Sequence, residues 1–298
     1  MSVRIGLVGA GAIAHAHAQS CCDLGLTFGV WARGHAADFA RRWSIEEYET
    51  YESLLDACDI VLVAAPTPAH EELVLAALAR GRDVICEKPL TLDSLASRRL
   101  ADAASRSGTR LLPAHVLRWS PPYAAIHDRV LAGEVGWLSR LHLTHRGAAP
   151  GQRWFHEPAG GGLITDLLIH DVDQAMWLAG DVSMVKAATW HDDGGEHASI
   201  ELTHTGGVVS EVEGTWGPPG MPYTSSIDVT GERGSLHHAS TEVSGWYESP
   251  WTTQLRDLVA ACTDGTAPRV TLEDGLRAVA VAEAAREAAR TGDPVRPA

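Results

Sequence analysis

Lysine is nearly missing from this sequence. Of its 24 lysine and arginine residues, only Lys88 and Lys186 are lysine. Arginine stays protonated in any protein environment, whereas burial and neighbouring charges can change the pKa of a lysine until its proton becomes exchangeable. The lysine in the stretch ICEKPL, residues 85–90, therefore indicates proton chemistry or a compact point charge at that position.

Other features are missing as well. The net charge is −14 and no run of basic residues is present, which argues against nucleic acid and anionic membranes as partners. The five cysteines are odd in number and form no CxxC pair, so neither a disulfide framework nor a zinc site is expected, and a reduced cytoplasm fits best. No segment approaches the ~20 apolar residues of a membrane span.

What is present has the composition of a soluble globular protein, with 45% hydrophobic and 21% charged residues. The 298 residues are enough for two domains. In the first part, short apolar runs alternate with helical patterns, which is typical of βαβ units and a doubly wound parallel sheet. The expected strands are 3–9, 27–32, 59–65, 83–87 and 109–116, and the expected helices are 12–24, 36–43, 71–79 and 94–107.

The pattern changes after Pro121 and Pro122. Residues 140–145, 198–204, 208–214 and 225–231 alternate apolar with polar side chains, which predicts an antiparallel sheet with one covered face. Helices are expected up to Leu131, over 162–178 and over 272–290. We therefore expect an α/β domain over residues 1–118 and an α+β domain with an open, mostly antiparallel sheet over 119–298. The bare face of that sheet would suit a homodimer or homotetramer.

A glycine-rich stretch follows the first expected strand. Gly9 would allow a tight turn, Gly11 would let the backbone approach a pyrophosphate, and Ala14 would keep helix and strand close. Small residues also turn strands into helices without any ligand. Here the stretch follows a strand and opens a helix, which favours dinucleotide binding, with Ala12 and Ile13 beside the cofactor.

The end of the second strand bears on the choice of cofactor. A protein that prefers NAD(H) usually places an acid there to hold the ribose hydroxyls. This chain has Ala32 and Arg33 instead, and Arg33 could pair with a 2′-phosphate, so NADP(H) is expected to be preferred, with NAD(H) as the alternative. A solvated arginine in a turn would explain the same residue without any ligand.

Three ionisable residues repeat along the expected helix 162–178. Asp166, His170 and Asp173 stand at i, i+4 and i+7, so that around an α-helix His170 and Asp173 lie within about 20–40° of Asp166. Apolar residues cover most of the remaining surface, so the helix is expected to be buried and its ionisable face to mark a functional site. An internal Asp–His hydrogen bond is the simpler interpretation. A metal held with Asp171 is not expected, because no third ligand with suitable spacing is visible.

Together these motifs resemble the glucose-fructose oxidoreductase/inositol dehydrogenase (Gfo/Idh/MocA) family. The resemblance rests on GxGxxA from Gly9, Glu87-Lys88-Pro89 after a strand, and GGGxxxDxxxHDxD over 160–173, and it runs nearly end to end. It implies a Rossmann domain, an open-faced second domain, and oxidoreduction of a sugar, cyclitol or related compound with a pyridine nucleotide.

By position, the resemblance assigns catalysis to Lys88, Asp166 and His170. Lys88 would stand at the carboxyl end of a parallel strand and reach the same cleft as the Asp/His helix. It would polarise the substrate oxygen or share its proton, His170 would be the general acid/base, and Asp166 would orient His170 or a substrate hydroxyl. The resemblance further implies that Glu87 meets the nicotinamide ribose, that Thr67 lies beside the nicotinamide, and that the Lys88–Pro89 peptide bond is cis.

Contacts to a polyol or ketosugar are expected from several polar and aromatic residues. Indoles suit the flat faces of sugars, although tryptophan is more often found in a core or an interface. The candidates are His115, Arg118, Trp119, Arg153, Trp154, His156 and Asp173. Two rival functions remain: a catalytically silent dinucleotide-binding regulator, and an enzyme of the same fold that acts on a bilin, an imine or a glycosidic bond.

Overall fold

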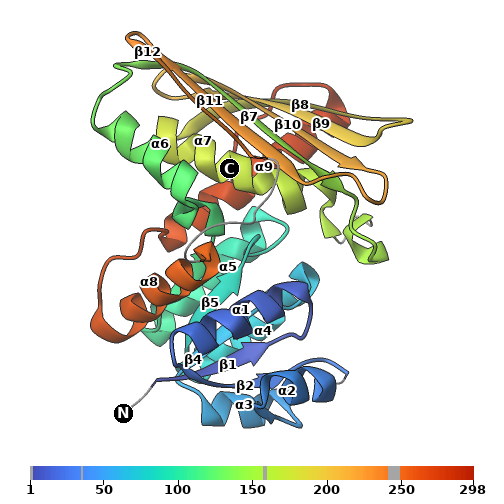
Figure 1. Cartoon of the computed structure of the whole chain (residues 1–298), viewed down its shortest axis with the longest axis vertical. Coiled ribbons are helices and arrows are strands. Elements are labelled where there is room, and N and C mark those ends of the chain that lie inside the picture. Colours follow the sequence, from blue (N-terminus) through green and yellow to red (C-terminus); the bar gives the residue numbers. More distant parts are fainter. Residues whose placement is uncertain (1–2, 35, 157–159, 241–248) are drawn as a thin grey trace. The chain divides into compact units, whose positions relative to one another are not determined.

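The computed structural model describes residues 3–34, 36–156, 160–240 and 249–298. The chain forms two compact units (Figure 1). The first comprises Met1–Thr91, Leu95–Trp119 and Tyr247–Leu276, and the second comprises Leu92–Ser94, Ser120–Trp246 and Arg277–Ala298. A single boundary at residue 118 therefore leaves out the later segment that completes the first unit.

The first unit is built on a parallel sheet of six strands. Their order is β3-β2-β1-β4-β5-β6, so the direction of winding reverses between β1 and β4. Ligands of such sheets bind beyond the carboxyl ends of the strands at this reversal. The strands are β1 (Arg4–Val8), β2 (Thr27–Trp31), β3 (Glu46–Glu47), β4 (Ile60–Val63), β5 (Asp83–Glu87) and β6 (Leu111–Ala114).

Helices pack around this sheet. Strands β1, β4 and β5 are buried almost throughout, as strands covered on both faces must be. The helices are α1 (Ala12–Asp23), α2 (Ala37–Trp43), α3 (Tyr51–Ala57), α4 (His70–Ala79), α5 (Ser94–Ser107) and α8 (Pro250–Asp264). Helix α8 packs on α1 and on the 3-10 turn η2 (Val116–Trp119). Its Leu255 and Leu258 join Trp119 in the core of the unit, which explains why the segment after residue 247 belongs there.

The second unit contains a mixed sheet of six strands in the order β12-β11-β7-β10-β9-β8. Only β7 and β10 pair in parallel; the other neighbours are antiparallel. The predicted doubly wound sheet and open, mostly antiparallel sheet are thus confirmed. The strands are β7 (Leu138–Ala148), β8 (Val182–Asp192), β9 (Gly195–His204), β10 (Val209–Gly217), β11 (Thr224–Gly231) and β12 (Gly234–Ser240).

One face of this sheet is covered. Figure 1 shows α6 (Pro121–Leu131) and α7 (Ile169–Ala179) beneath it, and α7 packs on β7 and β10. Along β7 the buried residues Leu141, Leu143 and His145 alternate with the more exposed Arg140 and Arg146. This alternation is what a strand with one covered face requires. Helix α9 (Leu272–Thr291) closes the chain.

The helix expected over residues 162–178 differs from the prediction. Ile164–Leu168 form a π-helical turn, and the α-helix α7 begins only at Ile169. A π turn bonds i to i+5 and changes the rotation between residues, so the angles calculated for one continuous α-helix were wrong. Such turns occur often at functional sites, and this one carries Asp166.

Within the described residues, no helix is long and apolar enough to span a bilayer. All five cysteines are free thiols.

Candidate functional site

The glycine loop of the first unit leaves room for a ligand. Gly9 has φ +115°, and a Cβ there would lie 2.5 Å from the carbonyl oxygen of Ala64 after β4, so only glycine fits. Apart from its chain neighbours and nearby helix backbone, no atom of the described residues lies within 4 Å of where a Cβ of Gly11 would be. Gly11 is the N-cap of α1 and provides no side-chain cap. The N–H groups at this helix end therefore suit a pyrophosphate.

The residues expected beside the cofactor differ in how far they are exposed. Ala12 is exposed and Ile13 is 42% exposed, as apolar contacts to a cofactor can be. Thr67 is buried in the 3-10 turn η1 (Thr67–Ala69) beyond β4. Beyond β2, Ala32 is half-buried and Arg33 is exposed. The guanidinium of Arg33 lies 2.9 Å from the Glu72 carboxylate, and both side chains are exposed.

Lys88 stands at the carboxyl end of β5, and the Lys88–Pro89 peptide bond is cis, as predicted. The preceding Glu87 is buried, and its Oε1 lies 2.7 Å from Nε2 of His17 on α1. Its Oε2 accepts the backbone N–H of Lys88 at 3.2 Å. Burial raises the pKa of Glu87, but the hydrogen bond and charge of His17, with Lys88, outweigh it and lower that pKa. Glu87 therefore has an internal partner, His17. Its contact to the nicotinamide ribose stays a prediction.

A second buried histidine holds the other side of this turn. Nδ1 of His70 lies 2.9 Å from the carbonyl oxygen of Pro89, and its Nε2 lies 2.9 Å from that of Ala65. Burial lowers the pKa of His70, against the raising effect of the two carbonyls and of Glu87. A neutral imidazole carries one N–H, so it donates to one of the two carbonyls at a time. Sequence reasoning missed both His17, three residues after the glycine-rich stretch, and His70, three residues after Thr67.

In the second unit, Asp166 and His170 are half-buried on consecutive turns, whereas Asp173 is buried in α7. The π turn lies close against the sheet because β10 has a glycine there: a Cβ at Gly214 would lie 2.5 Å from Cδ2 of Leu168. This close approach fixes the turn that carries Asp166 and leads into His170.

A buried polar network lies behind His170. Nδ1 of His145 on β7 lies 2.9 Å from Oδ2 of Asp171, and its Nε2 lies 2.5 Å from the Tyr223 hydroxyl. The rings of His145 and His170 are 6.3 Å apart. Burial, followed by the charge of Asp171, raises the pKa of Tyr223, so its hydroxyl stays protonated and can donate to His145. The sequence showed these residues only as alternating strand positions, with Asp171 weighed as a metal ligand.

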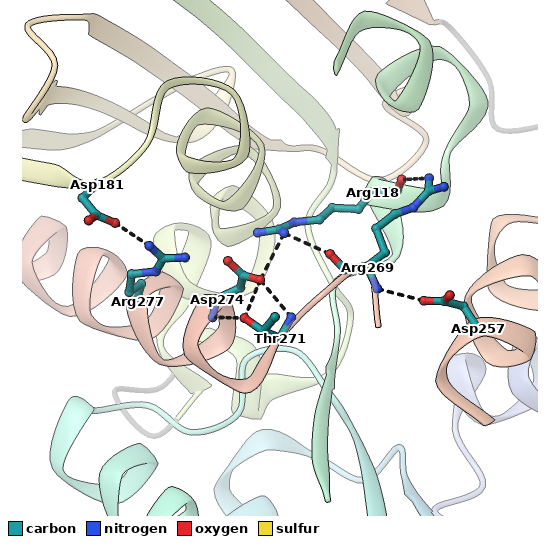
Figure 2. A network of polar contacts seen from close by, with 7 residues as sticks. All are labelled: Arg118, Asp181, Asp257, Arg269, Thr271, Asp274 and Arg277. Atoms are coloured by element: carbon teal, nitrogen blue, oxygen red, sulfur yellow. Dashed lines mark hydrogen bonds and ion pairs between the residues drawn. The ribbon is translucent and has the colours of Figure 1, made fainter. Parts of the chain in front are cut away.

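The residues expected at the crossing between the domains are internal. His115, Arg118 and Trp119 are 1%, 2% and 4% exposed. Figure 2 shows the Arg118 guanidinium directed at Asp274, 3.3 Å away, and at the carbonyl oxygen of Arg269. Trp119 belongs to the hydrophobic core. These contacts give Arg118 and Trp119 structural roles in place of the predicted contacts to substrate.

Asp274 illustrates how strongly this arginine acts. Burial raises the pKa of Asp274, but Arg118 and the hydrogen bonds from Thr271 outweigh it and bring that pKa to about 2. In Figure 2 the carboxylate accepts from the backbone N–H of Thr271 at 2.8 Å and from its hydroxyl at 2.7 Å. The pair fixes the start of α9.

The remaining candidates precede the triple glycine. Arg153 and Trp154 form the 3-10 turn η3 (Arg153–His156), but their side chains lie outside the described part of the structure. Nε2 of His156 lies 2.8 Å from the carbonyl oxygen of Pro150. In the described residues, no group of three or more His, Cys, Asp or Glu side chains could hold a metal ion.

Comparison with known proteins identifies the family of both domains. Residues 3–115 match the oxidoreductase family with an NAD-binding Rossmann fold, and residues 123–237 match the GFO/IDH/MocA C-terminal domain. Inositol 2-dehydrogenase of Ralstonia nicotianae is 32% identical over 212 residues, which are 68% of this chain and 61% of that protein. The enzyme of the same name from Serratia proteamaculans is 32% identical over 191 residues, 61% of this chain and 56% of that protein. The chain thus matches somewhat more than half the length of these relatives.

Solved structures show the same fold. GenD2 from gentamicin A biosynthesis, crystallised with NAD, superposes with a TM-score of 0.90 at 25% identity, covering 99% of this chain and 96% of that one. Myo-inositol 2-dehydrogenase from Lactobacillus plantarum superposes with a TM-score of 0.87 at 21% identity over the whole of both chains. With both domains matched in order, the chain belongs to the Gfo/Idh/MocA family of oxidoreductases.

Proposed function

We propose that this chain is an NAD(P)-dependent dehydrogenase or reductase that acts on a CH–OH group of a sugar, a cyclitol or a related hydroxy or keto compound. The observation that carries the proposal is the Lys88–Pro89 turn, which lies beyond the carboxyl end of β5 and is tied through Glu87 to the helix that follows the glycine loop. The relatives named inositol 2-dehydrogenase support a polyol as the substrate.

A nicotinamide cofactor would supply the acceptor or donor of the hydride. Gly9 and Gly11 with the start of α1 would hold its pyrophosphate, and Thr67 would lie on the nicotinamide side. We expect NADP(H) to be preferred, because Arg33 is exposed and neither of its sequence neighbours at the end of β2, Ala32 and Gly34, is an acid. The contact between Arg33 and Glu72, 2.9 Å long, would have to break for the guanidinium to bind a 2′-phosphate.

The protein's own residues would handle the proton at the substrate oxygen. Imidazole is the side chain whose ordinary pKa is nearest neutral pH, which suits His170 as general acid/base. Lys88 would polarise the same oxygen, and Asp166, one turn before His170, would orient the imidazole or a neighbouring hydroxyl. Arg153, Trp154 and Asp173 remain candidates for contacts to the other hydroxyls.

The test is a steady-state assay of the purified chain with NADP⁺ or NAD⁺ against polyols and cyclitols, and with the reduced cofactors against ketosugars. Turnover of at least one compound, with a higher kcat/KM for the phosphorylated cofactor, is expected. Binding of nucleotide without turnover across the panel would support a silent regulator instead. Turnover confined to an imine or a bilin would support an enzymatic function but reject the proposed substrate class.

The bare face of the second sheet also supports a proposal. Its side chains include charged pairs across strands, for example Arg140 with Glu211. We infer that this face joins two or four copies of the chain, in a reducing cytoplasm that suits five free thiols. Sedimentation equilibrium at micromolar concentration should give a dimer or tetramer; a monomer would contradict the assembly.

A further inference from the structure

Two buried histidines from different helices hold the lysine-bearing turn of the first unit. His17 comes from α1 and His70 is the first residue of α4. Both are 1% exposed. Side chains of this kind are costly to bury unless they are hydrogen-bonded. Their contacts therefore show what the turn needs in order to keep its position.

The two histidines hold opposite sides of Lys88. His17 binds the side chain of the preceding Glu87 at 2.7 Å, and the same carboxylate accepts the N–H of Lys88. His70 reaches the carbonyl oxygen of the following Pro89 at 2.9 Å. The turn is thus held on one side through the Glu87 side chain, by His17 of α1, and on the other through the Pro89 carbonyl, by His70 of α4.

The same contacts join three loops at the carboxyl ends of β1, β4 and β5. The second nitrogen of His70 meets the carbonyl oxygen of Ala65, in the loop after β4. The neighbouring Ala64 carbonyl lies against Gly9, in the loop after β1. A shift of the lysine turn would therefore disturb the loop predicted to hold the pyrophosphate and the loop that carries Thr67.

We propose that His17 and His70 are positioning residues that set the place and the environment of the Lys88 ammonium. The inference rests on the proposed function for its catalytic consequence, because Lys88 must act on the substrate for its position to matter to turnover. Misplacement of an acting group by about 1 Å can cost roughly 10²-fold in rate. Loss of either histidine is expected to lower kcat by about 10- to 100-fold while KM for the cofactor changes less.

The scarcity of lysine allows a direct test that does not depend on turnover. Lys88 and Lys186 are the only lysines, and Lys186 lies in an exposed pair with Glu201 in the second unit. Labelling with an amine-reactive acylating reagent across a pH series, read out by peptide mass spectrometry, gives the reactivity of Lys88 with Lys186 as the internal reference. The variants are His17→Leu and His70→Leu, with His17→Gln and His70→Gln in case a leucine variant does not fold.

We expect the pH dependence of Lys88 labelling to shift in the His17 and His70 variants, while that of Lys186 stays unchanged. Glutamine at position 70 can donate two N–H groups, so His70→Gln should retain more of the wild-type profile than His70→Leu. The matched control is His237→Gln, at an exposed histidine paired with Asp228, which should change neither lysine.

The outcomes separate the two proposals. A Lys88 profile that shifts in the His17 and His70 variants, while the wild-type protein turns over none of the polyols, upholds the positioning and rejects the proposed function. An unchanged Lys88 profile in folded His17 and His70 variants overturns the positioning, whether or not the enzyme is active.

Discussion

Nε2 of His17 lies 2.7 Å from Oε1 of Glu87, and both side chains are buried. The contact ties the helix that follows the glycine loop to the end of the strand that presents Lys88. Two segments whose contacting residues are 70 positions apart in sequence are thus joined by a direct side-chain contact. The effect of losing this contact on stability can be measured.

Glu87→Gln should destabilise the chain in a pH-dependent way. The pKa of Glu87 is lowered in the folded chain, so its contribution is present above its ordinary pKa of 4.5 and is lost as the pH falls through the lower folded value. We expect a loss of about 1–3 kcal/mol in the free energy of unfolding at neutral pH. Urea denaturation at several pH values measures it, and a difference that stays constant down to acid pH would contradict this origin.

Asp274→Ala should leave the Arg118 guanidinium buried without its carboxylate. Removal of one partner of a buried pair costs about 3–5 kcal/mol, and we expect a loss near the lower end. Because the pKa of Asp274 is about 2 in the folded chain, against an ordinary 3.8, the loss is full above about pH 4 and fades as the pH falls towards 2. Asp181→Ala, which removes the more exposed pair with Arg277, is the control and should cost less than about 1 kcal/mol.

Asp171→Asn should disturb the network behind His170. The carboxylate is fully buried and faces Nδ1 of His145, which in turn meets the Tyr223 hydroxyl. We expect a drop in stability of about 3 kcal/mol, because an amide cannot replace the charge. Asp228→Asn, at the exposed pair with His237, should stay within about 0.5 kcal/mol. Equal thermal midpoints for the two variants would show that the buried pair stabilises the chain no more than the exposed pair does.

The proposed preference for NADP(H) depends on Arg33 and its partner Glu72. Arg33→Ala should raise KM for NADPH by about tenfold or more and leave KM for NADH nearly unchanged, because a charge-assisted pair with the 2′-phosphate is lost. Glu72→Gln should act in the opposite direction, since it frees the guanidinium. Initial rates with both cofactors decide. A wild-type preference for NADH would reject the role of Arg33.

Much of this fold could be predicted from the sequence. Strands such as Ile60–Val63 are uninterrupted apolar runs, and β7 alternates strictly, so periodicity alone indicates which sheet each belongs to. The two-residue β3 and the exposed β8 carry no such signal, and neither was predicted. Helix α8 was missed as well, and its return to the first unit is a tertiary contact that no local pattern encodes.

The site divides in the same way. Lys88, Asp166 and His170 stand in short sequence motifs, so they could be proposed as site residues from the sequence alone. By contrast, the partners of Glu87 and Arg118 lie 70 and more than 150 residues away. Arg118 was expected to contact substrate because a charged residue near a domain crossing usually faces solvent. In the structure it is buried, and the Asp274 carboxylate compensates its charge. A π turn is equally invisible in an apolar sequence that also suits an α-helix.

The most direct test of the account compares the two lysines of the chain. Lys88→Arg keeps the charge but not the geometry or the exchangeable proton, so kcat should fall by about 10²-fold or more. Lys186→Arg, at the exposed pair with Glu201, should leave turnover within about twofold of wild type. Near-normal turnover of Lys88→Arg on a polyol that the wild type oxidises would remove Lys88 from the mechanism and contradict the account.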